Sequence, residues 1–317
     1  MKNSNVLEKI RLLSAFGERQ LAGEHAARNL LCDWLHAAAV PYRVQSFMTA
    51  VPKILQASLV ADGKTIPAAG TSFVSGTITD SSTLISSLTS SQKFLYEQNI
   101  NFNPRCKVIS RSNHYFAPSL AVAPAALSAI CRASTIQGIV RVKKIKHCSA
   151  NILVGNTKNP QTILFCHYDS IGPGAVDNAS GTALLLQMII ETPKYLKENL
   201  FVFAGNEELS YDQPVYWGRG YRVFERRYYS LLQRAKNILI IDCLGQTAAR
   251  QYRDPAIVRL GFPVMHQHRW TKKIAMIAGD LGALMRVYHS SADTANIIQP
   301  GHMHQARVLT ERLLIRR

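Results

Sequence analysis

From about residue 150 onward, short apolar runs alternate with longer helical patterns, and this alternation most constrains the fold. Short apolar runs bounded by turn signals are typical of buried strands in a parallel sheet. The order predicts an α/β fold whose sheet is mostly parallel, with helices on both faces. We predict strands at 151–154, 162–166, 200–203 and 238–241, and helices at 179–191, 221–235 and 305–315.

Side chains that suit metal ions stand where several of these strands end. They are His167, Asp177, Glu207, Glu208, Asp242 and His289. In open α/β sheets, ligands bind beyond the carboxyl ends of the strands. Four carboxylates and two imidazoles gathered there would repel one another and lose solvation unless cations held them together. The series therefore predicts a metal centre at this edge of the sheet.

Each member of the series, taken alone, also has a simpler interpretation. Asp177 stands just before the helix expected from Ala179, where Asp is a good helix N-cap. Glu207 and Glu208 could form a solvated acidic turn, or could divide the roles of metal ligand and general base. Asp169 lies two residues after His167 and could accept a hydrogen bond from that ring. The residues themselves leave these alternatives open.

The amino-terminal half has a different pattern of predicted elements. Helices are predicted at 5–15 and 20–38, followed by a strand at 41–47. From about 50 to 147, short alternating strands are separated by Gly- and Ser-rich stretches, which predicts a smaller α+β unit inserted into the larger domain. Within it, Leu84, Ile85 and Leu88 have the spacing of a helix in the biased segment 81–92.

Composition limits the classes of partner and compartment. The chain has 317 residues, 47% of them hydrophobic, and a net charge of +17, so it is globular with a basic surface. No nucleic-acid motif accompanies that charge, and we predict no nucleic-acid partner. Six cysteines without paired spacing and a charged amino terminus predict a reducing, cytoplasmic setting and no signal peptide. No long apolar stretch indicates a membrane partner.

Taken in order, the motifs resemble those of the zinc-dependent co-catalytic aminopeptidase family, which includes bacterial aminopeptidase S, plasma glutamate carboxypeptidase and the glutaminyl cyclases. The matching segments are His167–Ser170, Gly174–Gly181, Glu207–Glu208, Ile241–Asp242 and His289–Thr294, together with the stretch from Gly17 to Leu35. The segment between Asp242 and His289 is shorter than is usual in that family. Residues 261–263 and 274–277 are expected to be what remains there of a strand, a helix and pocket walls.

The resemblance implies a role for each matched residue. Asp177 would bridge two zinc ions, His167 and Asp242 would complete the first, and Glu208 and His289 would complete the second. Glu207 would be the general base, Asp169 would orient His167, and Tyr288 would donate a hydrogen bond to the developing oxyanion. A site rich in carboxylates also suits Mn²⁺ or Co²⁺.

The resemblance also implies an architecture and an activity. The expected fold is a three-layer α/β sandwich with a mixed, mostly parallel sheet. Its zinc peptidase domain would comprise 1–48 and 149–317, and 49–148 would form an inserted protease-associated-like α+β domain. The expected activity is hydrolysis of the N-terminal residue of a peptide substrate with a free amino group. A single-zinc glutaminyl cyclotransferase and a non-catalytic peptidase-like binding protein are the alternatives, and the sequence makes no prediction of oligomeric state.

Overall fold

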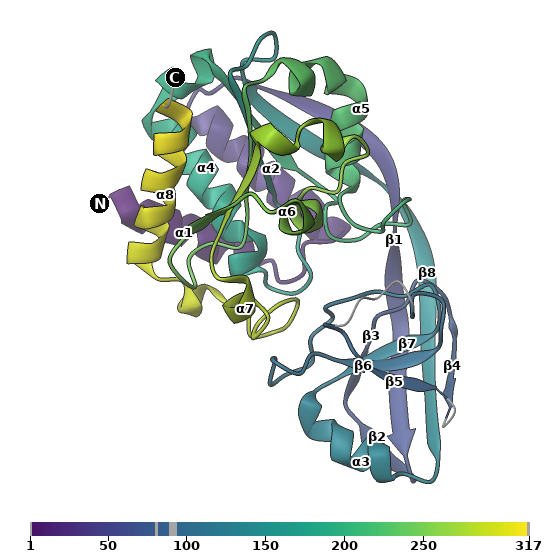
Figure 1. Cartoon of the computed structure of the whole chain (residues 1–317). Coiled ribbons are helices and arrows are strands. Elements are labelled where there is room, and N and C mark those ends of the chain that lie inside the picture. Colours follow the sequence, from purple (N-terminus) through teal and green to yellow (C-terminus); the bar gives the residue numbers. More distant parts are fainter. Residues whose placement is uncertain (1, 80–81, 89–93, 316–317) are drawn as a thin grey trace. The chain divides into compact units, whose positions relative to one another are not determined.

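The chain divides into two compact units. The computed structural model describes residues 2–79, 82–88 and 94–315. The first unit comprises Met1–Thr49, His147–Leu284 and Asp293–Arg317, and the second comprises Ala50–Lys146 and Met285–Ala292. The long strands β1 (Tyr42–Ala61) and β8 (Ile136–Gly155) carry the chain from one unit to the other (Figure 1).

Four parallel strands form the centre of the first unit. They are β9 (Thr162–His167), β10 (Asn199–Ala204), β11 (Asn237–Ile241) and β13 (Ile274–Ala278). Thr162 pairs with both Asn199 and Asn237, and Ile238 pairs with Ile274, so the four strands begin in register at one edge. Nearly all their residues are buried, as expected of parallel strands covered on both faces. β13 contains residues 274–277, one of the two segments expected to remain between Asp242 and His289.

Antiparallel strands flank this parallel centre. β8 pairs with β10, and β12 (Arg250–Tyr252) pairs with β13, both antiparallel. The strand order is β12-β13-β11-β9-β10-β8-β1. The sheet is therefore mixed. Several predicted metal ligands lie at or after the ends of its parallel strands.

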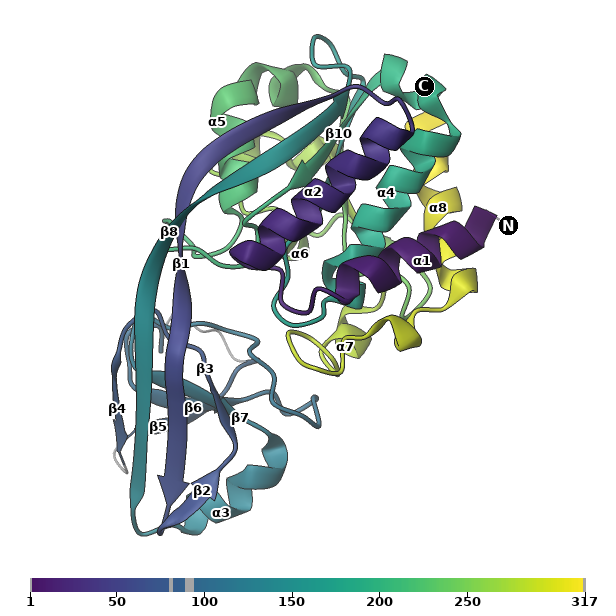
Figure 2. The same cartoon turned by 180° about the vertical axis from the view of Figure 1, so that it is seen from behind.

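Helices cover both faces of this sheet (Figures 1 and 2). One face carries α1 (Lys2–Ser14), α2 (Ala22–Ala37), α4 (Ser180–Glu191) and α8 (Pro300–Ile315), with α4 in contact with the other three. The other face carries α5 (Arg219–Arg234) and α6 (Pro255–Gly261). Ten consecutive residues of α4, from Ser180 to Ile189, are buried, because this helix lies between the sheet and its neighbouring helices. The predicted α/β three-layer fold is confirmed.

The second unit has its own sheet and core. Its strands β3 (Ala68–Gly70), β7 (Ser119–Val122), β6 (Asn99–Phe102) and β5 (Thr83–Ser86) follow one another in that spatial order. Elsewhere in this unit β4 (Gly76–Thr79) pairs with β8, β2 (Lys64–Ile66) pairs with β1, and α3 spans Leu127–Arg132. Its buried core residues are Leu59, Ile78, Ile100, Leu120, Val122, Ile130 and Val140. Whether this unit acts as a protease-associated-like insert stays a prediction.

The helix predicted around Leu84, Ile85 and Leu88 is wrong. Thr83–Ser86 forms strand β5, which pairs in parallel with β6. Short hydroxyl side chains compete with helical hydrogen bonds, and the Ser86 hydroxyl accepts from the backbone N–H of Leu88. Pairing with β6 buries Ile85, which a short isolated helix could not do as well. The rest of that prediction, residues 81 and 89–92, lies outside the described residues.

Among the described residues, no helix is both long and apolar enough to span a bilayer. The short helix α7 (Leu281–Leu284) is the last described element before the segment that joins the second unit.

Phe165 joins the sheet to the helices of one face and offers a test of this packing. Its fully buried ring lies 5.0 Å from that of Phe224 on α5 and 4.8 Å from that of Phe262 after α6, between centroids. We expect Phe165→Ala to lower the free energy of unfolding by roughly 3–5 kcal/mol, because a large cavity remains. Urea unfolding measures this. Val44→Ala, at a residue 47% exposed, should change it by less than about 0.5 kcal/mol; equal effects would contradict the packing.

Candidate metal centre

Five of the predicted site residues lie at the carboxyl ends of the parallel strands of the first unit. His167 is the last residue of β9, and Asp242 directly follows β11. Glu207 and Glu208 come three and four residues after β10, and Asp177 lies in the short turn Ala175–Ala179 that leads into α4. All five side chains are buried. The edge predicted from the sequence is thus the edge at which they meet.

Two separations between donor atoms match those found around one small cation. His167 Nε2 lies 3.2 Å from Asp177 Oδ1 and 3.4 Å from Asp242 Oδ1. Ligands about 2.0–2.2 Å from a tetrahedral zinc ion are separated from one another by roughly 3.3–3.6 Å. The donor set of one imidazole and two carboxylates, at these separations, therefore fits zinc.

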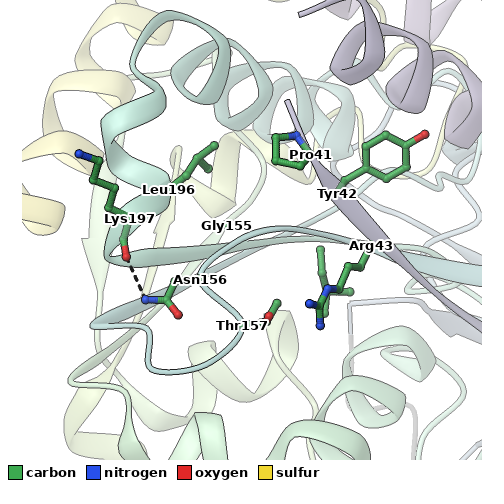
Figure 3. Close-up of a pocket in the computed structure, with 9 residues that line it drawn as sticks. Pro41, Tyr42, Arg43, Gly155, Asn156, Thr157, Leu196 and Lys197 are labelled. Atoms are coloured by element: carbon green, nitrogen blue, oxygen red, sulfur yellow. Dashed lines mark hydrogen bonds between the residues drawn. The ribbon is translucent and has the colours of Figure 1, made fainter. Parts of the chain in front are cut away.

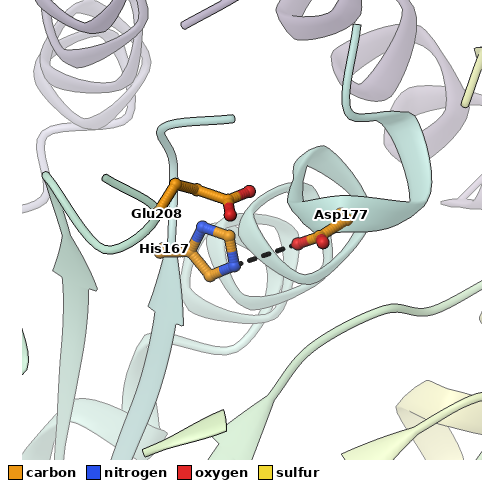
Figure 4. A group of neighbouring side chains, drawn as sticks. All are labelled: His167, Asp177 and Glu208. Atoms are coloured by element: carbon orange, nitrogen blue, oxygen red, sulfur yellow. Dashed lines mark ion pairs between the residues drawn. The ribbon is translucent and has the colours of Figure 1, made fainter. Parts of the chain in front are cut away.

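Two further donors border this trio. Ligand atoms of His167, Asp177 and Glu208 lie within 4.8 Å of one another, and Figure 4 shows the Glu208 carboxylate beside the His167 ring. Ligand atoms of Asp177, Asp242 and Cys243 form a second such group, in which the Cys243 thiol donates to Asp242 Oδ1 over 3.3 Å. Asp177 belongs to both groups, and that it bridges two ions stays a prediction. Sequence reasoning did not single out Cys243 for this site.

The electrostatics of this cluster favour added positive charge. Burial alone would lower the pKa of His167, but the attraction of Asp242 and contacts with Asp169 and Asp177 outweigh it and raise that pKa well above the usual value. Burial raises the pKa of Glu207 well above that of an exposed glutamate; His167 opposes this rise, and Glu208 adds to it. A divalent ion bound by such groups would displace protons from them.

Asp169 does more than the predicted orientation of His167. Its carboxylate lies 3.6 Å from His167 Nδ1, and its backbone oxygen lies closer, at 3.2 Å. The same carboxylate accepts the backbone N–H groups of Glu207 over 3.0 Å and of Glu208 over 2.9 Å. Asp169 therefore fixes the backbone on which the predicted base and the neighbouring ligand are carried.

Asp293 positions the loop that carries Asp177. Its two oxygens accept the N–H groups of Val176 over 2.7 Å and Asp177 over 3.1 Å. Gly174 opens this loop with φ +55°, and a Cβ there would meet the Asp177 backbone oxygen at 2.4 Å, so only glycine fits. Burial raises the pKa of Asp293 to about 6. The orientation of Asp177 is thus set from the far end of the sequence.

Arg19 is the main residue whose part sequence reasoning missed. Its fully buried guanidinium donates to the backbone oxygens of Tyr168 (2.6 Å), Pro173 (2.7 Å) and Gly174 (2.9 Å), and to that of Leu13. Burial lowers its pKa to about 10, against the attraction of Asp169 and Asp293. It thus clamps the loop between His167 and Asp177. The stretch Gly17–Gly23 entered the sequence resemblance, but no spacing or pattern there revealed this contact.

The loop after Glu208 is held by a second buried arginine. Arg222 on α5 donates to the backbone oxygens of Val215 (2.9 Å), Trp217 (2.6 Å) and Pro263 (3.1 Å), and to Asp212 Oδ2 (3.0 Å). The backbone N–H of Gly218 donates to the oxygen of Glu207. The loop over 210–218 is therefore tied at both of its ends to the segment that carries Glu207 and Glu208.

His289 and Tyr288 belong to the second unit, in the segment Met285–Ala292. There the backbone oxygen of His289 accepts from Arg111 over 2.9 Å, its Nδ1 lies 3.3 Å from the Arg111 oxygen, and its ring stacks on Tyr288 with centroids 3.7 Å apart. The structure thus brings together Asp169 and five of the predicted residues of the first unit. That His289 and Tyr288 join them stays a prediction.

A separate cavity of about 450 Å³ lies where β1 begins and β8 ends (Figure 3). Its lining is Pro41, Tyr42, Arg43, Leu153, Gly155, Asn156, Thr157, Leu196 and Lys197. None of these is a predicted site residue. The cavity therefore belongs to a different part of the first unit from the metal-ligating cluster.

Comparison with known proteins agrees with this geometry. Residues 150–218 match the model of peptidase family M28, and this segment contains His167, Asp177, Glu207 and Glu208. No curated protein sequence matches the chain.

Solved structures extend the likeness to the whole chain. A zinc aminopeptidase from Bacillus subtilis has a TM-score of 0.67 at 18% identity, covering 97% of this chain and 93% of that one. An aminopeptidase from an Aneurinibacillus strain has 0.63 at 16%, covering 98% and 93%. A glutaminyl cyclase from an Acidobacteriales bacterium has 0.54 at 14%, covering 99% and 93%. The resemblance of the sequence to the zinc aminopeptidase family is thus confirmed: the chain has the fold of these enzymes and carries a peptidase family M28 segment.

Proposed function

We propose that this protein is a zinc-dependent metallo-exopeptidase that hydrolyses the N-terminal residue of peptides. The observation that carries the proposal is the position of His167 Nε2, 3.2 Å from Asp177 and 3.4 Å from Asp242, with Glu208 beside it. No simpler arrangement explains why acids from three strand ends are buried together at the edge where this fold class binds its ligands. The M28 match, whose segment contains His167, Asp177 and Glu208, supports the proposal.

The proposed centre holds two zinc ions. Asp177 would bridge them, His167 and Asp242 would complete the first, and Glu208 and His289 would complete the second. Bound zinc supplies a water of lowered pKa and polarises the scissile carbonyl. Mn²⁺ or Co²⁺ also suit a donor set of this kind.

The chain's own residues perform the proton transfers in this proposal. Glu207 takes a proton from the attacking water and passes it to the leaving amine, which is the role of a general base. Its side chain is buried beside those of the proposed ligands, and burial raises its pKa in the absence of a cation. Asp169 holds the backbone of Glu207 in place. Tyr288 donates a hydrogen bond to the oxyanion, and the free amino group of the peptide lies among the acidic groups of the centre.

The peptidase domain in this proposal comprises 1–48 and 149–317, and 49–148 is the protease-associated-like insert. The alternative on the same scaffold is a single-zinc glutaminyl cyclotransferase. A count of bound ions separates the two, because the proposed peptidase centre holds two zinc ions and the cyclotransferase would hold one.

Removal of the proposed base tests the chemistry. Glu207→Gln keeps the size of the side chain but cannot accept a proton, so kcat on aminoacyl chromogenic amides should fall by roughly 10²–10⁴-fold. Zinc content, measured by mass spectrometry, should stay at the wild-type level. Glu198→Gln, at an exposed glutamate, should match wild type. A Glu207→Gln enzyme as active as wild type would refute the peptidase mechanism.

The metal count tests the ligand assignment. Wild-type protein reconstituted with zinc and desalted should retain two ions per chain. His289→Ala should retain one, because it removes a ligand of the second ion only, and Asp177→Ala should retain neither. Inductively coupled plasma mass spectrometry gives the counts. One ion in the wild type, unaffected by His289→Ala, would favour the cyclotransferase.

Asp169→Asn tests how the loop backbone is held. An asparagine offers one acceptor oxygen where the carboxylate now accepts two N–H groups. We expect kcat to fall by roughly 10–100-fold with a smaller change in KM, because the base is displaced while the peptide site remains. Asp33→Asn, on the exposed side of α2, is the matched control. Equal kinetics for the two variants would show that Asp169 has no such role.

A further inference from the structure

The edge of the sheet opposite the metal-ligating cluster is strongly basic. Because the parallel strands begin in register, the residues that precede β9, β11 and β13 lie at one edge. Lys158, Lys236 and Lys272 occupy these positions and are exposed. Together with six exposed arginines nearby they form what we call the cationic surface, composed of Lys158, Arg226, Arg227, Arg234, Lys236, Arg253, Arg259, Arg269 and Lys272.

Direct contacts join these residues into one region. Arg234 on α5 donates to the Lys158 backbone oxygen over 3.2 Å, and Arg253 donates to that of Lys272 over 3.5 Å. Arg269 donates to the hydroxyl of Tyr229 on α5 over 2.9 Å, and Lys273 donates to the oxygen of Gln233 at the end of that helix over 2.7 Å. The segment 265–273 therefore lies along α5, and their charges share one side of the first unit.

Little negative charge balances this region. Segments 219–236 and 253–273 contain two acids, Glu225 and Asp254. Glu225 is buried and accepts from the backbone of Met265 and His266, and Asp254 caps α6. Both carboxylates are thus engaged within the chain. The nine residues of the cationic surface are about a quarter of the chain's 37 lysines and arginines.

Two large apolar side chains are exposed next to these cations. Leu260, beside Arg259, is 64% exposed, and Met265, whose N–H donates to Glu225 on α5, is 56% exposed. In contrast, Trp270 is buried, and the hydroxyl of Tyr229 accepts from Arg269. Exposed aliphatic side chains among cations suit insertion between lipid headgroups, whereas stacking on nucleic-acid bases needs exposed aromatic faces.

We propose that the cationic surface binds the anionic face of a lipid bilayer, with Leu260 and Met265 entering the headgroup region. This is peripheral binding and needs no spanning helix. Sequence reasoning predicted no membrane partner because no basic run is long; the fold gathers separate pairs of basic residues onto one side.

Vesicle sedimentation tests the proposal. Wild-type protein should bind vesicles of phosphatidylcholine and phosphatidylserine, should not bind vesicles of phosphatidylcholine alone, and should dissociate as salt is raised. Arg226→Ala/Arg227→Ala should weaken binding by roughly 30-fold, at about 1 kcal/mol per basic residue near the lipid. Leu260→Ser/Met265→Ser should also weaken it. The melting temperature of each variant checks its fold.

Arg141→Ala/Lys143→Ala is the matched control, because it removes two exposed positive charges from β8 in the second unit. It should bind anionic vesicles as wild type does. Equal losses of vesicle binding in Arg226→Ala/Arg227→Ala and in Arg141→Ala/Lys143→Ala would show a response to net charge alone and would overturn the proposal. So would failure of the wild type to bind anionic vesicles, including the case in which it binds duplex nucleic acid instead. Peptide hydrolysis is measured separately, so its failure would not be confused with either result.

Discussion

The hydrogen bonds from the backbone of Glu207 and Glu208 to the Asp169 carboxylate are the contacts on which the candidate centre depends. They join the segment after β9 to the segment after β10, two neighbouring parallel strands whose ends would otherwise be connected only through the sheet. A carboxylate that accepts two backbone N–H groups is well stabilised when buried. Asp169 also lies beside His167, with its backbone oxygen 3.2 Å and its carboxylate 3.6 Å from Nδ1, so one residue contacts both the imidazole and the segment of the two glutamates.

Arg19 gives this arrangement its second anchor. A buried guanidinium is costly to desolvate, and here each of its nitrogens is used on the backbone of the 168–174 loop or of α1. The positive charge also lies near a group of acids, which lowers the repulsion among them before any cation binds. The amino-terminal helices are therefore part of what holds the predicted ligands, although they contribute none of the predicted ligands themselves.

The sequence was sufficient to predict the strands β9, β10 and β11 of the first unit and five of the residues that cluster at their ends. Apolar runs such as Ile238–Ile241 specify buried strands, and the polar residue after each run must then lie at the carboxyl edge. The contacts of Arg19 and Asp293 could not be predicted, because they join residues more than 100 positions apart through backbone atoms that carry no sequence signal. The strand at 83–86 was missed because the prediction rested on three apolar residues at helical spacing. The parallel pairing of this segment with β6 decides its structure instead.

The pairing of β13 has a consequence for how such a protein can diversify. The chain leaves β11 at Asp242 and returns to pair beside it at Ile274, so the residues between form an excursion whose two ends are fixed by the sheet. Shortening or rebuilding that excursion changes the outer wall of the molecule while Asp242 keeps its place. Evolution or an engineer could therefore change the length and shape of this stretch and leave the donor atoms of Asp242 in place.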